Sequence, residues 1–462
     1  MFKKIEIWVL YLVILFSILF AVGFGALVRH QMLGGKGLES IGLGWVSKTA
    51  LFFAEIPSNA KRIIIDDSGD STVEDRFPTL DGFDGTPSIE ESYLLLSRYD
   101  GDLQEGVVEL VDLTNFEVLH TWNPDIYAFN DLVEQVDEFK YLDRDLKNSR
   151  YMLYHPLFTK KGNLIFNAQN APLRIIDKCS NLILQNTHDG FHHSVETDID
   201  GNIWTSTHMY PQSLPIEKVG RKTPNEDGFR DDAIVKLSLD GEVLYEKSVS
   251  RMLIENGMES RLSMVGTFHE FQVDPIHIND VQPVNVDGKY WKKGDVFISL
   301  GHQSMIILWR PSTEEIVWKY ESNIFHQHDV NIVNEYQISI FNNNRKYYYP
   351  SKDIVDGNNQ ILIFNFDTDT VSSYLSKSLA REDIRTISQG RSNILVNNDL
   401  FIEETDYART LYFNADGSLR WTHVNRAGDG KVYMVGWSRI LYTKKDIQTV
   451  NNFLTNKGTC NE

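Results

Sequence analysis

Residues that can bind an anion recur at comparable places along the chain. They are His155, His193, His277, His328 and Arg391, and each is followed within 7 to 11 residues by a turn, at Gly162, Gly201, Gly288, Glu335 and Asn398. Imidazole rings can ligate a metal, transfer protons or attack an electrophile, and imidazolium and guanidinium cations bind anions. If these positions are equivalent in a repeat, they converge on one funnel that binds an anionic ligand.

The stretch IFHQHDVNIV places two histidines at the head of a strand-like run. Side chains two residues apart on a strand share a face, so we expect His326 and His328 to point the same way. We interpret His328 as facing the funnel and His326 as supporting it. Gln327 and Asp329 then face the other side and tie the strand to neighbouring backbone.

The same alternation predicts that His277 and Asn279 share a face and that His192 and His193 do not, with His193 the inward member. A structural role is at least as well favoured for histidines near the ends of repeat units, which are His188, His208 and His302. A metal site is disfavoured because no Asp or Glu shares the histidines' strand position. We expect Asp274 and Asp329 to face elsewhere.

These positions belong to a repeat of strands separated by turn sequences such as DGN, DGE, DGK and DGS. Six units of three to four strands follow one another from about residue 90. Such a repeat predicts an all-β fold, a six-bladed β-propeller over residues 90–445, with a tail at 446–462. The first strand of each blade lines the central channel, which would bring the equivalent residues together. A long β-sandwich is less favoured because it would not need the same phase in each unit.

The N-terminal segment predicts a membrane anchor. Residues 5–28 are almost wholly apolar and follow Lys3 and Lys4, so we expect one transmembrane helix within residues 1–30. The lysines place the N-terminus in the cytoplasm and the bulk of the chain on the periplasmic, extracytoplasmic side. Residues 31–89 are expected to be a membrane-proximal linker with a helical segment. A cleaved signal peptide is the alternative.

Charge and cysteine content limit the function classes. The formal net charge is −19, which repels phosphates and excludes nucleic acid as an expected partner. Cys179 and Cys460 form no metal-binding CxxC pattern and allow at most one disulfide, whose formation the sequence leaves open.

Several of these stretches together resemble a known family. FHHSVETDIDGNIW, DPIHINDVQPV, ISLGHQSMIILW, HQHDVNIV and NNDLFIEETDYARTLYFNADGSLRWTH are similar, in this order, to the arylsulfate sulfotransferases of the bacterial periplasm. The resemblance covers roughly residues 150–440. It implies a six-bladed propeller that moves a sulfuryl group from a phenolic sulfate ester to a phenol or other hydroxyl acceptor. It implies a sulfohistidine intermediate and neither a nucleotide sulfate donor, a metal nor another cofactor.

By motif, the resemblance places the nucleophile at His328 and the remaining catalytic positions at His277, Asn279 and His193. One position departs from the family: its anion-binding arginine reads as Gly301, followed by His302. A glycine cannot replace a bidentate guanidinium. Substrate binding would then fall to Arg391, His302, His155 or Arg345.

Two other functions stay open. A propeller that has lost the reaction would bind a sulfated or otherwise anionic glycan, or a partner protein, at the same funnel, and the missing arginine favours it. A metal- or quinone-dependent propeller enzyme is the third and least favoured hypothesis.

Overall fold

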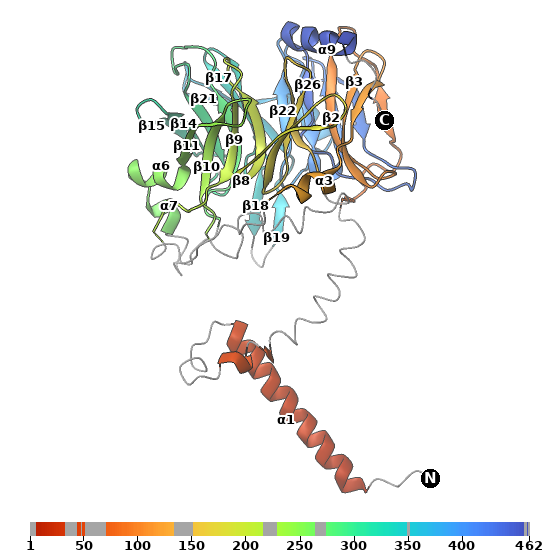
Figure 1. Cartoon of the computed structure of the whole chain (residues 1–462), viewed down its shortest axis with the longest axis vertical. Helices are drawn as coiled ribbons and strands as arrows, with labels where there is room; N and C mark the ends of the chain where they lie inside the picture. The colour runs from red at the N-terminus through yellow and green to blue at the C-terminus, as the bar shows by residue number, and fades with distance from the viewer. Residues whose placement is uncertain are drawn as a thin grey trace. The chain divides into compact units, whose positions relative to one another are not determined.

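The computed structural model describes residues 6–32, 44–47, 49–50, 71–133, 151–215, 229–263, 274–348, 352–456 and 460. The chain forms two compact units, Met1–Asp70 and Ser71–Glu462. The first unit contains helix α1 (Ile7–Met32) (Figure 1). Within this helix, Ile7–Arg29 has a mean hydropathy of 2.7 and is long enough to cross a membrane, and a signal sequence would meet the same criteria. Most of the predicted linker up to residue 70 lies outside the described residues.

The second unit is built from antiparallel sheets in a propeller-like arrangement (Figure 1). The first sheet combines strands from both ends of the unit, in the order β26 (Arg439–Leu441), β2 (Tyr93–Asp100), β3 (Glu105–Asp112) and β4 (Glu117–Trp122). A seven-stranded sheet follows, in the order β11 (Val243–Ser248), β10 (Asp232–Leu237), β9 (Ile203–His208), β8 (Leu182–Thr197), β7 (Ala171–Ile176), β6 (Leu164–Asn167) and β5 (Tyr154–Phe158).

The remaining sheets continue the same pattern. One has the order β12 (Ile278–Pro283), β13 (Val296–Leu300), β14 (Met305–Arg310) and β15 (Glu315–Tyr320). The next has the order β16 (Val330–Asn334), β17 (Gln337–Asn342), β20 (Gln360–Asn365) and β21 (Thr370–Tyr374), with β18 (Arg345–Tyr348) and β19 (Lys352–Val355) as a separate hairpin. The last sheet has the order β1 (Gly82–Gly85), β25 (Leu419–Val424), β24 (Arg409–Phe413), β23 (Leu400–Glu404) and β22 (Arg391–Ile394).

Short helices occupy the connections and one end of the unit. They are α3 (Ile126–Asp131), α6 (Val249–Glu255), α7 (Ser260–Ser263), α8 (Ser376–Arg381), the 3₁₀ turn η2 (Thr405–Tyr407) and α9 (Lys444–Asn456). Val450 and Phe453 of α9 pack against Trp122 and Leu441, so this helix covers the first sheet and its neighbour.

Apolar side chains fill the space between successive sheets in separate clusters. Central strands such as β13 (VFISL) and β14 (MIILWR) are buried on both faces, which explains why their sequences are nearly continuous apolar runs. The outermost β21 (TVSSY) is largely exposed and polar. The predicted DG turns occur at Gly201 and Gly241, whose positive φ angles of 90° and 84° favour glycine.

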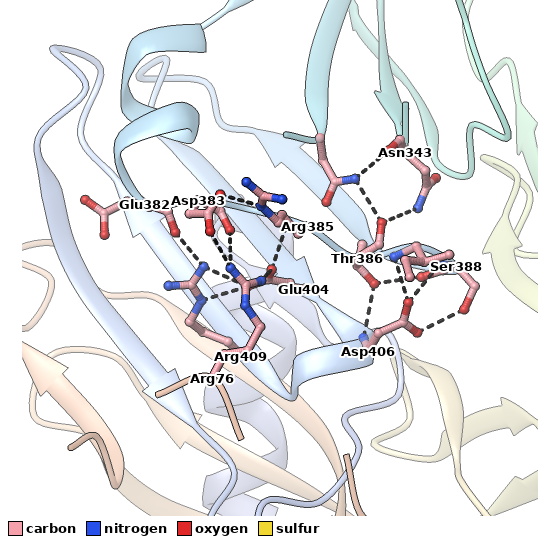
Figure 2. Close-up of polar contacts among 12 residues, drawn as sticks. Arg76, Asn343, Glu382, Asp383, Arg385, Thr386, Ser388, Glu404, Asp406 and Arg409 are labelled. Atoms are coloured by element: carbon pink, nitrogen blue, oxygen red, sulfur yellow. Dashed lines mark hydrogen bonds and ion pairs between the residues drawn. The ribbon is translucent and has the colours of Figure 1, made fainter. Parts of the chain in front are cut away.

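The compact unit extends beyond the predicted propeller, residues 90–445, at both ends. The compact unit begins at Ser71 rather than residue 90, because β1 adds a strand to the last sheet by pairing with β25. Arg76, which precedes β1, forms an ion pair with the buried Glu404 at 2.8 Å (Figure 2). The expected C-terminal tail contains most of helix α9, and the Cys179–Cys460 disulfide ties its end to the turn after β7.

Candidate active site

Histidines from three neighbouring inner strands converge around Trp437, which precedes β26. The ring centre of His193 lies 5.0 Å from that of His277 and 6.3 Å from that of His328. The Trp437 ring lies 5.8 Å from His193 and 6.1 Å from His328. His302 stacks on His277 at 4.4 Å. We call His193, His277, His302 and His328 the histidine cluster.

One type of hydrogen bond recurs between neighbouring inner strands and aligns these residues with one another. The backbone N–H groups of Val281, Val330 and Ser392 each donate to a buried side chain on the neighbouring inner strand, namely Ser194, Asp280 and Asp329, with each bond 2.9 Å long. These links make His193, Asn279 and His328 equivalent, since each immediately precedes one of the acceptors.

By the same equivalence, His277 corresponds to His326 and not to His193. The predicted equal phase therefore holds only for His193 and His328. His277 lies two residues before the equivalent position, whereas His155 and Arg391 lie one residue after it, at the position of the linking residues. Both His277 (φ 53°) and His326 (φ 52°) have left-handed backbone conformations, as does His193 (φ 58°). Such conformations cost non-glycine residues on the order of 1–3 kcal/mol and concentrate at functional sites. A bulge between Ile278 and Asp280 also breaks the simple alternation expected for His277 and Asn279.

The tautomer of His328 is fixed by its neighbours. Nδ1 lies 2.7 Å from Asn343 Oδ1 and 3.1 Å from the His326 carbonyl oxygen. The Asn343 amide nitrogen donates to the carbonyls of Gln389 and Thr386, so its oxygen must face the ring. Nδ1 therefore carries the proton and Nε2 the lone pair. Burial, with a contribution from nearby His277, lowers the pKa of His328 to about 3, which keeps the ring neutral at physiological pH.

A loop approaches the lone pair of His328. The Gln389 N–H donates to His328 Nε2 at 2.9 Å. Gln389 has a positive φ of 56°. Asp406 holds this loop by accepting from the backbone N–H groups of Ile387 and Ser388, each at 2.8 Å, and Figure 2 shows this carboxylate with Ser388, Thr386 and Asn343.

His277 forms a dyad with Asp274. Nδ1 lies 2.8 Å from Asp274 Oδ2, and the Asp274 carbonyl accepts from His302 Nδ1 at 2.6 Å. Burial disfavours protonation of His277, but the Asp274 carboxylate outweighs it and raises the pKa of His277 above its usual value. His277 can therefore hold a proton near neutral pH, unlike His328. Arg230 Nη1 lies 3.5 Å from the same carboxylate oxygen.

Asn279 and Gly301 pack tightly together. Asn279 is buried, and its amide nitrogen donates to the Gln327 carbonyl at 2.7 Å, while its side-chain oxygen has no hydrogen-bond partner. A Cβ atom on Gly301 would lie 2.3 Å from this nitrogen. An arginine at position 301 would therefore require Asn279 to move.

The sequence predicts that His155 and Arg391 bind substrate. The His155 ring packs edge-on against Trp437, with ring centres 5.6 Å apart, so His155 adjoins the histidine cluster. His155 is fully buried, its Nδ1 accepts from the Val195 N–H at 3.0 Å, and its Nε2 lies 2.7 Å from Arg439 Nη2. These contacts occupy both ring nitrogens and favour a structural role. Arg391 lies 3.9 Å from Asp329 and, with Arg439, lines a separate cavity of about 150 Å³. Arg345 begins β18, and its N–H bonds to the Phe325 carbonyl at 3.4 Å.

The prediction for Gln327 and Asp329 is confirmed. Gln327 donates to the carbonyls of Leu300 and Met305 at 3.1 and 3.0 Å, and Asp329 accepts from Ser392 N at 2.9 Å. The prediction that Asp274 faces elsewhere is wrong, because the left-handed residue His277 turns the chain back toward it.

Sequence reasoning also missed Asn343, Trp437 and Arg230. Asn343 lies in the NNN run after β17, where no spacing rule connects it to His328. Trp437 precedes Arg439 as Gln389 precedes Arg391, so a closer alignment of the repeat units could have found it.

The sheets and the histidine cluster define an all-β, propeller-like protein with a site suited to acid–base or nucleophilic chemistry. Residues 155–426, more than half of the chain, match the arylsulfotransferase (ASST) family. The chain therefore belongs to the arylsulfotransferase family, which confirms the resemblance found in the sequence. No curated protein sequence matches the chain.

Three solved structures illustrate a distant similarity. A protein of unknown function from Bacteroides caccae has 10% identity and a TM-score of 0.44, covering 77% of this chain and 100% of its own. The WD40 β-propeller domain of Doa1 has 11% identity and a TM-score of 0.39, covering 79% and 96%. A virginiamycin B lyase from Staphylococcus aureus has 10% identity and a TM-score of 0.33, covering 58% and 69%.

The close contact at Gly301 predicts the effect of adding a single methyl group. Gly301→Ala should destabilise the fold by about 1–3 kcal/mol, the usual cost of overpacking, and displace Asn279. Thermal unfolding measures the loss. Gly190→Ala is the matched control, because the nearest atom to its Cβ lies at 3.6 Å, an ordinary contact distance. Equal melting temperatures for the two variants would contradict the packing described.

Proposed function

We propose that the chain transfers a sulfuryl group from a phenolic sulfate ester to a hydroxyl acceptor through a covalent intermediate on His328. The observation that carries this proposal is the arrangement of His328, whose Nε2 lone pair lies within a histidine cluster and whose Nδ1 proton is held by Asn343. A neutral, buried imidazole with a fixed tautomer is a competent nucleophile. Membership of the arylsulfotransferase family supports the sulfuryl group as the species transferred.

In the first half-reaction, His328 Nε2 attacks sulfur as the bond from sulfur to the phenolic oxygen breaks. The phenolate leaves with the bonding electron pair and takes a proton from His277, which Asp274 keeps protonated. The Nδ1 proton stays on the sulfated ring and continues to face Asn343. Since the Gln389 N–H occupies the lone pair in this structure, that hydrogen bond must break before the attack.

In the second half-reaction, the acceptor hydroxyl attacks sulfur and the bond between sulfur and Nε2 breaks, returning the electron pair to the ring. His277, now neutral, takes the hydroxyl proton, so each residue regains its starting state. His193 and the amide of Asn279 are the proposed donors to the sulfuryl oxygens. Arg230 and His302, which adjoin the His277–Asp274 dyad, are proposed to replace the family's arginine in attracting the anion.

A second candidate function is the binding of an anionic glycan or a partner protein without transfer. The glycine at position 301 and the engaged state of His328 Nε2 favour it. Retention of His328, His277 and Asn279 at one site favours transfer instead.

We also propose that the propeller has six blades, with the seven-stranded sheet counted as two blades that share β8. Six apolar clusters, each combining residues of one pair of neighbouring units, support this count. A seventh cluster, which contains Tyr99 and Tyr154, joins the same pair of units as the first. An experimental structure with another number of blades would contradict it.

The nucleophile is tested with His328→Asn, which keeps a similar volume and polarity but removes the attacking nitrogen. This variant should abolish turnover of 4-nitrophenyl sulfate with phenol as acceptor, whereas His277→Asn should slow it by about 100- to 10,000-fold. Mass spectrometry after brief exposure of the wild type to the donor should find one sulfated histidine, at position 328. His188→Asn, at an exposed site on β8, is the control and should keep wild-type activity.

Turnover by His328→Asn would show that the nucleophile is assigned to the wrong residue. A wild type that binds the aryl sulfate but neither turns it over nor becomes labelled would support the binding function.

The dyad predicts a pH effect. Protonated His277 is needed to release a poor leaving group, so the rate with phenyl sulfate should fall as pH rises through the pKa of His277. Asp274→Asn removes the charge that raises this pKa, and the alkaline limb should therefore move to lower pH. The pH dependence of kcat/KM measures the shift. A limb that stays in place would exclude His277 as the acid.

Helix α1 is proposed to remain uncleaved and to anchor the β domain on the extracytoplasmic side of a membrane, supported by its apolar length and by Lys3 and Lys4 before it. The mature chain should keep its first 30 residues and stay with membranes during carbonate extraction. A soluble mature form that begins after Arg29 would identify the segment as a signal peptide instead.

A further inference from the structure

A second group of buried titratable side chains lies beside the histidine cluster. It consists of His192 on β8, His208 on β9 and Asp232 on β10, which are 2%, 5% and 0% exposed. The strand register explains why they meet. Asp232 lies directly opposite His208, and His208 lies opposite Gly190, two residues before His192, so all three share one face of the sheet.

The spacing of these three side chains suits a metal ion. His208 Nε2 lies 3.0 Å from Asp232 Oδ1, and His192 Nε2 lies 3.4 Å from the same oxygen. The three potential ligand atoms all lie within 4.8 Å of one another. Ligands about 2.0–2.1 Å from a common ion are separated by roughly 2.8–3.4 Å in octahedral or tetrahedral geometry. Both measured separations fall in this range.

Two of the ligand atoms lack a regular hydrogen bond. His192 Nε2 and Asp232 Oδ1 are buried and form no hydrogen bond of regular geometry. Their contacts with each other and with His208 Nε2 are ion pairs only when an imidazole is protonated. Leaving such groups unsatisfied is costly, and each one in a native structure calls for an explanation. A bound cation at the point where they converge would satisfy both.

The other polar side-chain atoms of Asp232 and His192 already have hydrogen-bond partners. Asp232 Oδ2 accepts from the Ile278 N–H at 2.8 Å, so Oδ1 is the carboxylate oxygen that faces the two histidines. His192 Nδ1 lies 2.6 Å from His193 Nδ1 and 3.3 Å from Ser206 Oγ. Outer contacts of this kind orient metal ligands in known sites.

We propose that His192, His208 and Asp232 bind a divalent first-row transition-metal ion such as Zn²⁺. Two imidazole nitrogens and one carboxylate oxygen favour such ions over Ca²⁺ or Mg²⁺, which prefer oxygen ligands alone. The sequence argument against a metal considered only residues at the shared inner-strand position, whereas His208 and Asp232 come from the neighbouring strands β9 and β10.

The site would also act on the histidine cluster. A metal on His192 Nε2 leaves the proton on Nδ1, which then donates to His193 Nδ1 across the 2.6 Å contact. His193 must then carry its own proton on Nε2. The metal would thereby fix the tautomer of a residue proposed to donate to the sulfuryl oxygens.

A second set of potential ligands, Asp274, His277 and His302, is less suited to a metal. The Nδ1 atoms of both histidines are already hydrogen-bonded, one to the Asp274 carboxylate and the other to its carbonyl. This set belongs to the proposed catalytic machinery and serves as the comparison in the test.

The test uses the full chain in detergent, stripped with a chelator, incubated with Zn²⁺ and desalted. Elemental analysis should find about one zinc per chain in the wild type and little in His208→Gln or Asp232→Asn. Zn²⁺ should raise the melting temperature of the wild type and leave that of both variants unchanged. Visible absorption of the Co²⁺-loaded wild type should be lost in the same variants.

Two variants serve as controls. His188→Gln removes an imidazole from the same strand β8 and should keep its zinc. His302→Gln tests the alternative set and should also keep it. A wild type that retains neither Zn²⁺ nor Co²⁺ would overturn the proposal even if the ligand variants fail to fold. Loss of zinc in His302→Gln but not in His208→Gln would overturn it as well.

Discussion

The β domain depends on one interaction that is repeated between neighbouring inner strands: a buried side chain accepts the backbone N–H of the next strand. Ser194, Asp280 and Asp329 do so at 2.9 Å, and His155 does so at 3.0 Å through a ring nitrogen. Glu403 joins the last sheet to the first by accepting from Trp437 N and Ser438 N, each at 2.6 Å. Because buried N–H groups must be paired, this interaction fixes how deep each inner strand sits relative to its neighbours.

The candidate active site uses the residues next to these links. His193, Asn279 and His328 each precede a linking residue, so the contact that holds two sheets together also positions a functional side chain. His193 and His277 have left-handed backbone conformations, and their rings lie 5.0 Å apart at this site. The pKa values of the two histidines shift in opposite directions: the Asp274 carboxylate raises that of His277, whereas burial, with only a neutral amide as partner, lowers that of His328.

Much of this arrangement could be predicted from the sequence. Alternating apolar runs and DG turns predicted the all-β fold, and the recurrence of histidines predicted that His193, His277 and His328 would meet. The prediction failed where the backbone departs from a regular strand. A bulge and a positive φ displace His277 from the expected register, bring Asp274 to its ring and separate its role from that of Asn279. The partners of His328 and the group formed by His192, His208 and Asp232 depend on contacts between strands, which spacing along one strand does not reveal.

The first sheet contains β2 from the beginning of the domain and β26 from near its end. During vectorial synthesis, the edge of β2 that pairs with β26 therefore stays open until residues 439–441 become available. An exposed strand edge invites pairing with other chains. A truncated form that lacks the last 24 residues of the chain, from Arg439 on, would present this edge permanently.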